Sequence, residues 1–226
     1  MLLLKSIGMI LLLANAVGLL LMLRAISKPE RYNNFVKPIM AMELVRSPDD
    51  ITHVLADVGK FKQTPTPEEF FKTGLRWDGY IIIPFYWGLL MTFSFLLSRH
   101  QFASAKWLGI ASGLSTTVAA AFDYLENHRM KLALDNHSLA AGVRQASLYK
   151  WGLLFVAFGL LASMFLWRWD SVVVIGTLYL LTALIGLIGL RQDQLIEWSF
   201  LPLMAGGAAF GAMLLFAPQR FLAGFS

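Results

Sequence analysis

The chain has 226 residues, of which 57% are hydrophobic and 15% are charged. Soluble domains carry about a quarter charged residues, so this composition excludes an ordinary soluble domain and indicates an integral membrane protein. The net charge of +5 does not indicate a nucleic-acid partner, because the basic residues lie between apolar runs, where they signal topology and contact anionic lipids. There is no cysteine, which excludes disulfides, thiolate catalysis and thiolate metal sites.

Six apolar stretches approach the roughly 20 residues that a helix needs to cross a bilayer. Aromatic or basic residues flank most of them, as they do at the two faces of a membrane. We therefore expect an all-α fold, an integral membrane bundle of about six transmembrane helices. The stretches run from Ile7 to Leu23, Tyr80 to Leu97, Ala103 to Phe122, Leu148 to Trp167, Ser171 to Leu190 and Trp198 to Ala217.

The first stretch has two interpretations. Lys5 precedes the apolar run and Ala14-Asn15-Ala16 resembles a cleavage site, as in a signal peptide. The run continues beyond that site to Leu23, which favours a retained anchor. On the second interpretation the chain divides into a first transmembrane helix at 1–24, an extramembrane segment at 25–77 and a five-helix transmembrane bundle at 78–226.

The extramembrane segment carries two helix-start signals. Ser47 can cap a helix that begins at Pro48 and carries acids in its first turn. Thr66 and Glu69 fit a capping box for a second helix. We expect these helices to end near Gly59 and Gly74, to be amphipathic, and to form a short two-helix cap on the membrane surface.

The number of spans determines which segments share a face. With six spans, the 24–77 segment, the 123–147 loop and the 190–198 turn lie on one side, and a tight turn at 168–170 lies on the other. Thirteen of the 19 lysines and arginines fall on the first side. The positive-inside rule then places that side in the cytoplasm of a bacterial inner or thylakoid-type membrane.

Small residues recur every four positions in two of the predicted spans, a spacing that lets neighbouring helices approach closely. The pattern favours packing within the bundle, with homodimerisation as the alternative. The residues are Ala105, Gly109, Gly113, Thr117 and Ala121 in the third span, and Gly207 and Gly211 in the sixth.

Polar residues gather at the ends of the second and third spans. Asp78 and Tyr86 lie eight residues apart on roughly one helical face, and Pro84 between them should kink the helix and free the Tyr80 carbonyl. A second set, at the end of the third span, shares one face at spacings of three and four. It consists of Asp123, Glu126 and Asn127.

This candidate polar site has three interpretations, and the sequence identifies no particular cofactor. The acids can form structural ion pairs with Arg76 or Arg129. Asp78, Asp123 and Glu126 can bind a hard divalent cation. They can also act as acid–base groups on a lipid-soluble substrate. The histidines do not form an H-E-x-x-H motif, and neither a P-loop nor a G-x-S-x-G motif is present.

Aromatic residues in the second and fourth spans have two interpretations. Phe93, Phe95, Phe155 and Phe158 can line a pocket for a quinone or carotenoid. Packing against lipid explains such residues better.

Three patches together resemble a loosely defined group of small, uncharacterised bacterial multi-pass membrane proteins. The patches are Ala41-Met42-Glu43-Leu44, the span that Asp78 opens, and the D-x-x-E-N motif from Asp123 to Asn127. The resemblance covers residues 35–130 and implies that Glu43 joins Asp78, Asp123, Glu126 and Asn127 in one polar site. It implies no activity.

The sequence therefore predicts a multi-pass membrane protein that is not an enzyme. We expect it to bind membrane lipids or a lipophilic ligand, or to serve as an accessory or assembly subunit for partner membrane subunits, with no nucleic acid involved. The alternative is a membrane-embedded enzyme that uses the acids on a lipid-like substrate. A transporter is least favoured, because the polar residues near mid-bilayer carry no charge.

Overall fold

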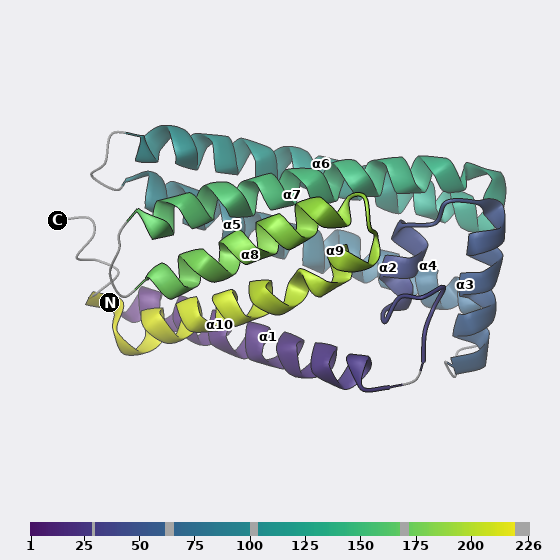
Figure 1. Ribbon diagram of the computed structural model, residues 1–226, viewed down its shortest axis with the longest axis horizontal. Helices are drawn as coiled ribbons and strands as arrows, with labels where there is room; N and C mark the ends of the chain where they lie inside the picture. Colours follow the sequence, from purple (N-terminus) through teal and green to yellow (C-terminus); the bar gives the residue numbers. More distant parts are fainter. Residues whose placement is uncertain (29, 62–65, 100–103, 168–171, 220–226) are drawn as a thin grey trace.

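The computed structural model describes residues 1–28, 30–61, 66–99, 104–167 and 172–219 (Figure 1). Within these ranges the regular structure is helical, and the one isolated β-bridge joins Tyr32 to Phe35. The predicted all-α class is therefore confirmed. The helices are α1 (Leu2–Ile26), α2 (Pro38–Glu43), α3 (Pro48–Phe61), α4 (Pro67–Trp77), the π-helical turn η1 (Asp78–Ile82), α5 (Ile83–Ser98), α6 (Ala105–Asp135), the 3₁₀ turn η2 (His137–Leu139), α7 (Ala140–Leu166), α8 (Val173–Gly189), α9 (Gln194–Trp198) and α10 (Phe200–Phe216).

Four helical stretches of the described chain are long and apolar enough to cross a membrane. They are Leu2–Ile26, Pro67–Ser98, His137–Leu166 and Gln194–Phe216, and α8 is a shorter apolar helix. The remaining long helix, α6, has 31 residues, of which the last thirteen include several charged ones. The fold therefore agrees with a multi-pass membrane protein, and the fifth and sixth spans stay a prediction.

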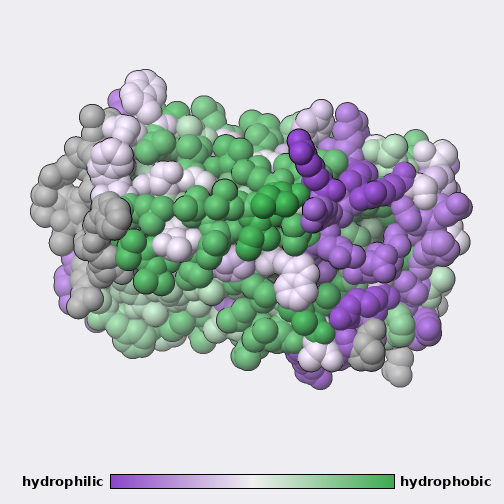
Figure 2. All heavy atoms as spheres, in the orientation of Figure 1, coloured by the Kyte–Doolittle hydropathy of each residue, from purple (hydrophilic) through white to green (hydrophobic). Residues whose placement is uncertain are grey.

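The surface separates into an apolar band and a polar end. Figure 2 shows hydrophobic residues over α7, α8 and α10, and hydrophilic residues at the end that holds α2 and α3. Large apolar side chains in the band are exposed, including Leu20 at 67% on α1 and Val174 at 60% on α8. Exposed apolar surface of this extent is expected where a protein meets lipid.

The polar end collects segments that are far apart in the sequence. The short helices α2, α3 and α9 lie there together with the C-terminal half of α6, whereas the N-terminus and the end of α10 lie at the opposite end (Figure 1). The 24–77 segment and the 190–198 turn therefore share one end of the bundle, as predicted. The predicted turn at 168–170 lies outside the described residues.

The second predicted surface helix is not a separate element, which corrects the two-helix cap. α4 does not end at Gly74 but continues through η1 into α5 as one helix over Pro67–Ser98. In the π register, Ile83 donates its backbone N–H to the Asp78 carbonyl, five residues earlier. At the same spacing, Pro84 leaves the Gly79 carbonyl without a backbone donor, and not the Tyr80 carbonyl as predicted. The Tyr124 hydroxyl donates to the Gly79 carbonyl at 3.0 Å instead.

The third predicted span also extends further than expected. α6 does not end at Phe122, because no glycine or proline interrupts residues 123–135, and it continues to Asp135. The predicted 123–147 loop is therefore wrong: helix α6, the short turn η2 and the start of α7 occupy it. Asp123, Glu126 and Asn127 thus lie inside a helix, on a face that is buried.

The helix-start signals in the extramembrane segment are confirmed. Asp50 accepts hydrogen bonds from the backbone N–H groups of Arg46 and Ser47, and its own N–H donates to the Ser47 hydroxyl at 3.3 Å. Thr66 accepts from the Glu69 N–H at 3.2 Å. Hydrogen bonds of this kind satisfy donors that the first helical turn leaves free. The apolar face of α3 is buried as its spacing predicts, although α3 ends at Phe61 rather than Gly59.

The small residues pack within the bundle. A Cβ atom at Gly8 would meet the Gly211 carbonyl oxygen at 2.7 Å, so α1 and α10 are in close contact. On α6, a Cβ at Gly109 would meet the Ser94 carbonyl oxygen at 2.6 Å, and Gly113 lies against Met91. The stripe on α6 therefore faces α5, as the intramolecular interpretation expects.

Three of the four singled-out phenylalanines pack inside the bundle rather than against lipid. Phe93, Phe155 and Phe158 are buried, whereas Phe95 is 56% exposed. Phe93 packs edge to face against Phe210, with ring centroids 4.8 Å apart, and Phe158 stacks on Tyr179. Aromatic rings that α5, α7, α8 and α10 contribute are therefore part of the core of the described chain.

We predict that Gly211→Ala destabilises the protein by about 1–3 kcal/mol, because the added methyl group overpacks the α1–α10 contact. Gly88→Ala is the matched control, since a Cβ there meets nothing within 4 Å. Thermal unfolding in detergent measures both. Equal stability of the two variants would contradict the packing.

Candidate functional site: a buried carboxylate–lysine cluster

Lys150 lies at the centre of the candidate site. Its Nζ atom donates to Glu43 Oε2 at 3.0 Å, to Asp123 Oδ1 at 3.2 Å and to Glu126 Oε1 at 2.9 Å. We call these four residues the carboxylate–lysine cluster. Glu43 comes from α2, the other acids from α6 and the lysine from α7, so the cluster joins three helices. An ammonium has three N–H donors, and here each has a carboxylate acceptor.

A second set of side chains orients the cluster. Trp151 Nε1 donates to Glu43 Oε2 at 2.9 Å, and the Tyr86 hydroxyl donates to Asp123 Oδ2 at 2.8 Å. Asn127 Nδ2 donates to Asp78 Oδ2 at 2.7 Å beside the cluster. The structure therefore brings together all the residues that the sequence singled out: Glu43, Asp78, Tyr86, Asp123, Glu126 and Asn127.

Sequence reasoning did not identify Lys150 and Trp151. A signal was present, because Lys150 is a charged residue near the start of the predicted fourth span, where charge is costly. The expected partners were Arg76 and Arg129 instead. Arg129 donates to the Gly142 carbonyl at 2.8 Å, and Arg76 is exposed and joins no ion pair in the described residues.

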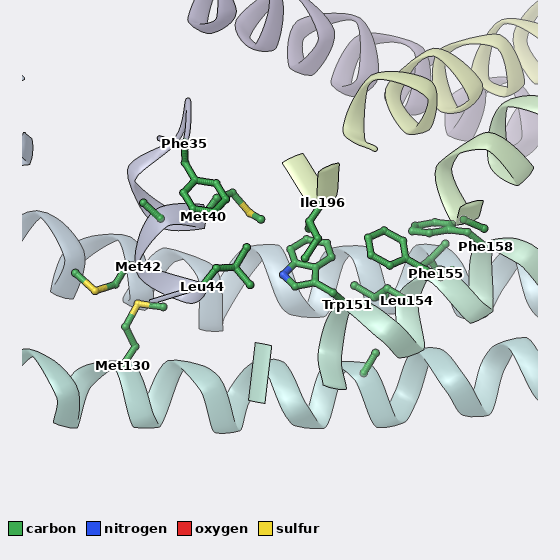
Figure 3. Packing of buried hydrophobic residues seen from close by; sticks show 14 of the residues in the cluster. Phe35, Met40, Met42, Leu44, Met130, Trp151, Leu154, Phe155, Phe158 and Ile196 are labelled. Carbon is green, nitrogen blue, oxygen red and sulfur yellow. The ribbon is translucent and has the colours of Figure 1, made fainter. Parts of the chain in front are cut away.

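The cluster is shielded from solvent on all sides. The exposed fraction is 7% for Glu43, 6% for Asp123, 1% for Glu126 and 2% for Lys150. Figure 3 shows part of the apolar surroundings: Met42 and Leu44 flank Glu43 in the sequence, and Met42 lies near Met130 whereas Leu44 extends toward Trp151. Asp78 differs from the other acids because it is partly exposed.

The charges in the cluster do not balance. Three carboxylates face one ammonium, so full ionisation leaves two surplus negative charges in a buried site, which is unfavourable at low dielectric. Burial raises the pKa of the Glu43 carboxyl above its ordinary value, although Lys150 opposes the shift. Glu126 Oε2 is buried and has no hydrogen-bond partner in the described part of the chain. The cluster therefore has capacity for a bound proton.

Backbone contacts hold α2 over the cluster. The Ser147 hydroxyl donates to the Glu43 carbonyl at 2.7 Å. At the other end, the Glu197 carboxylate of α9 accepts the N–H groups of Val36 and Lys37, both at 2.8 Å, and thereby holds the two residues that precede α2. The six-residue α2 is thus fixed at both ends.

Asp193, just before α9, makes a second ionic connection at the polar end. It accepts from Arg144 Nη1 at 2.7 Å and from Arg46 Nη2 at 2.9 Å, and Arg144 also donates to the Leu44 carbonyl. Burial alone would raise the pKa of Asp193, but the hydrogen bonds and charges of the two arginines outweigh it and hold the pKa below its ordinary value. These contacts join the extramembrane segment, α7 and the α8–α9 turn.

The predicted metal ligands do not lie around a common point. Among the described residues, no group of three histidine, aspartate or glutamate side chains is arranged to hold a metal ion. The Lys150 ammonium occupies the point where the carboxylates of Asp123 and Glu126 converge. His128 is exposed on another face of α6, and His137 lies 3.3 Å from the Thr52 hydroxyl, so neither belongs to the cluster.

Comparison of this chain with protein-family models, with curated proteins and with solved structures finds no match.

We predict that Lys150→Met destabilises the protein by about 3–5 kcal/mol, because it leaves three buried carboxylates without their cation. Glu126→Gln should change stability by less than about 1 kcal/mol or increase it, because it removes a surplus charge and keeps the side-chain shape. Thermal unfolding of both variants in detergent tests this asymmetry. If Glu126→Gln were as damaging as Lys150→Met, the view that the cluster has a surplus of negative charge would be wrong.

We predict that Asp193→Asn lowers stability by about 2 kcal/mol at neutral pH. Because the pKa of Asp193 is depressed in the folded state, its contribution is complete above the pKa of the unfolded chain and is lost as the pH falls through the folded-state pKa. The wild type should therefore lose stability relative to the variant on acidification below about pH 4. Unfolding curves from pH 7 to pH 3 measure the difference, and parallel curves would contradict it.

Proposed function

We propose that this chain spans the membrane six times and that its polar end faces the cytoplasm. In addition to the four long apolar stretches, residues 105–122 of α6 carry one charged residue, Lys106. α8 has 17 residues and is about 26 Å long, close to the thickness of a bilayer core. The basic residues concentrated in the 24–77 segment support the cytoplasmic side.

We further propose that the protein is a lipid-binding membrane protein rather than an enzyme. The carboxylate–lysine cluster supports this, because each Lys150 donor meets a carboxylate and Trp151 and Tyr86 hold two of those acids, which leaves Glu126 Oε2 as the one buried oxygen without a partner in the described residues. Such a closed cluster fixes α2 against α6 and α7 and leaves little reach toward a substrate. Its role is to hold the polar end in shape.

The lipid-binding proposal rests on the exposed aromatic and basic side chains of α4, η1 and α6, at the edge of the polar end. Trp77, Tyr80 and Tyr124 are exposed there, at 62%, 83% and 48%, next to the exposed cations Arg76 and Lys131. Aromatic rings and cations together are typical of the membrane–water boundary, where they contact lipid headgroups. An accessory or assembly role would use the same surface against a partner subunit.

One observation favours an enzyme as the second candidate. Asp78 is a partly exposed carboxylate that does not contact Lys150, and it lies beside Asn127 at the boundary of the membrane. It is therefore the member of the polar site that a lipid-like substrate can reach. This candidate requires that Asp78→Asn abolishes turnover of such a substrate while the fold survives.

We predict that the protein, extracted from its own membrane in mild neutral detergent, retains one or more anionic lipids. Native mass spectrometry should show a reproducible added mass in the range of a phospholipid, because cations at the boundary bind anionic headgroups at about 1 kcal/mol each. Detection of the protein without any added lipid mass would contradict the proposal. A larger assembly with no lipid mass would favour the accessory role.

A further inference from the structure

A hollow of about 390 Å³ opens on the outer surface between α4–η1 and α6. Arg76 and Tyr80 line it from one helix at a spacing of four residues, and Tyr124, His128 and Lys131 line it from the other at spacings of four and three. The Tyr124 hydroxyl donates to the Gly79 carbonyl at 3.0 Å and joins the two walls. One face of each helix therefore contributes to a single concave surface.

The charge of this hollow is positive. Arg76 and Lys131 are exposed and form no ion pair with any described residue, and His128 adds a ring that can donate a hydrogen bond. The acids nearby have other partners: Asp135 pairs with Lys72 at 3.4 Å, and Asp78 accepts from Asn127. The two cations are thus free to bind an anion from outside.

Apolar side chains are exposed further along the helices that form the hollow. Ile81, Ile82 and Phe85 are 50%, 54% and 50% exposed on η1 and α5. Val118 and Leu114 are 45% and 63% exposed on α6. A ligand that fits both parts must carry an anionic headgroup at one end and hydrocarbon at the other.

We propose that this hollow binds the phosphate headgroup of an anionic phospholipid, with the acyl chains lying along α5 and α6. The inference rests on the proposed lipid-binding function and assigns it to one site. Arg76 supplies a planar guanidinium that can donate two parallel hydrogen bonds to phosphate oxygens, and Lys131 supplies a second charge. Asn127 lines the hollow and holds Asp78, so the headgroup lies next to the carboxylate–lysine cluster without entering it.

The test is a titration of phosphatidylglycerol into the purified, delipidated protein in neutral detergent, followed by native mass spectrometry. The double variant Arg76→Gln/Lys131→Gln should weaken the tightest binding event by about tenfold or more, because two headgroup contacts are lost. Lys60→Gln/Arg191→Gln is the control, because it removes the same charge from exposed positions of the polar end outside the hollow. Phosphatidylcholine should bind wild type and double variant equally, since its headgroup has no net charge.

The outcomes separate the two proposals. If both double variants bind phosphatidylglycerol as the wild type does, the hollow is not the site, although lipid binding itself stands. If the wild type binds no anionic lipid in preference to phosphatidylcholine, both proposals fail. If free glycerol phosphate displaces the lipid at equal concentration, the hollow recognises a soluble phosphate and the lipid assignment is overturned.

Discussion

The buried ammonium of Lys150 is the contact on which the arrangement of the polar end depends. It reaches carboxylates of α2 and α6 from α7, so removing it would leave negative charges from different helices facing one another without water. The need to neutralise these charges explains why α2, a helix of six residues, has a fixed place over the bundle. Such a short helix cannot be stable by itself.

Two further carboxylates near the cluster also accept hydrogen bonds that join separate segments of the chain. Glu197 accepts two hydrogen bonds from the residues that precede α2, and Asp193 joins Arg46 and Arg144. Both acids lie in or beside α9, the short segment between α8 and α10. Charge-assisted hydrogen bonds therefore join the α2 segment, α7 and the α9 segment at the polar end.

A headgroup site needs cations whose separation is fixed, and Arg76 and Lys131 lie on two helices that continue into the bundle. The hydrogen bond from Tyr124 to the π-helical turn joins these helices where proline removes a backbone donor. The irregular turn is thus part of the wall of the hollow, and apolar side chains are exposed further along the same helices.

The sequence by itself determined the helical class, the apolar stretches and the caps at Ser47 and Thr66, because these depend on local spacing. It singled out the acids by the cost of burying charge, but whether they meet depends on the tertiary structure. It did not determine that α4 and α5 form one helix or that α6 continues to Asp135, since helix continuity near an interface depends on tertiary packing. Nor did it reveal Lys150 as the partner of Glu43, Asp123 and Glu126. Which face of α7 meets α6 depends on the rotation of one helix against another, and only the tertiary structure fixes that rotation.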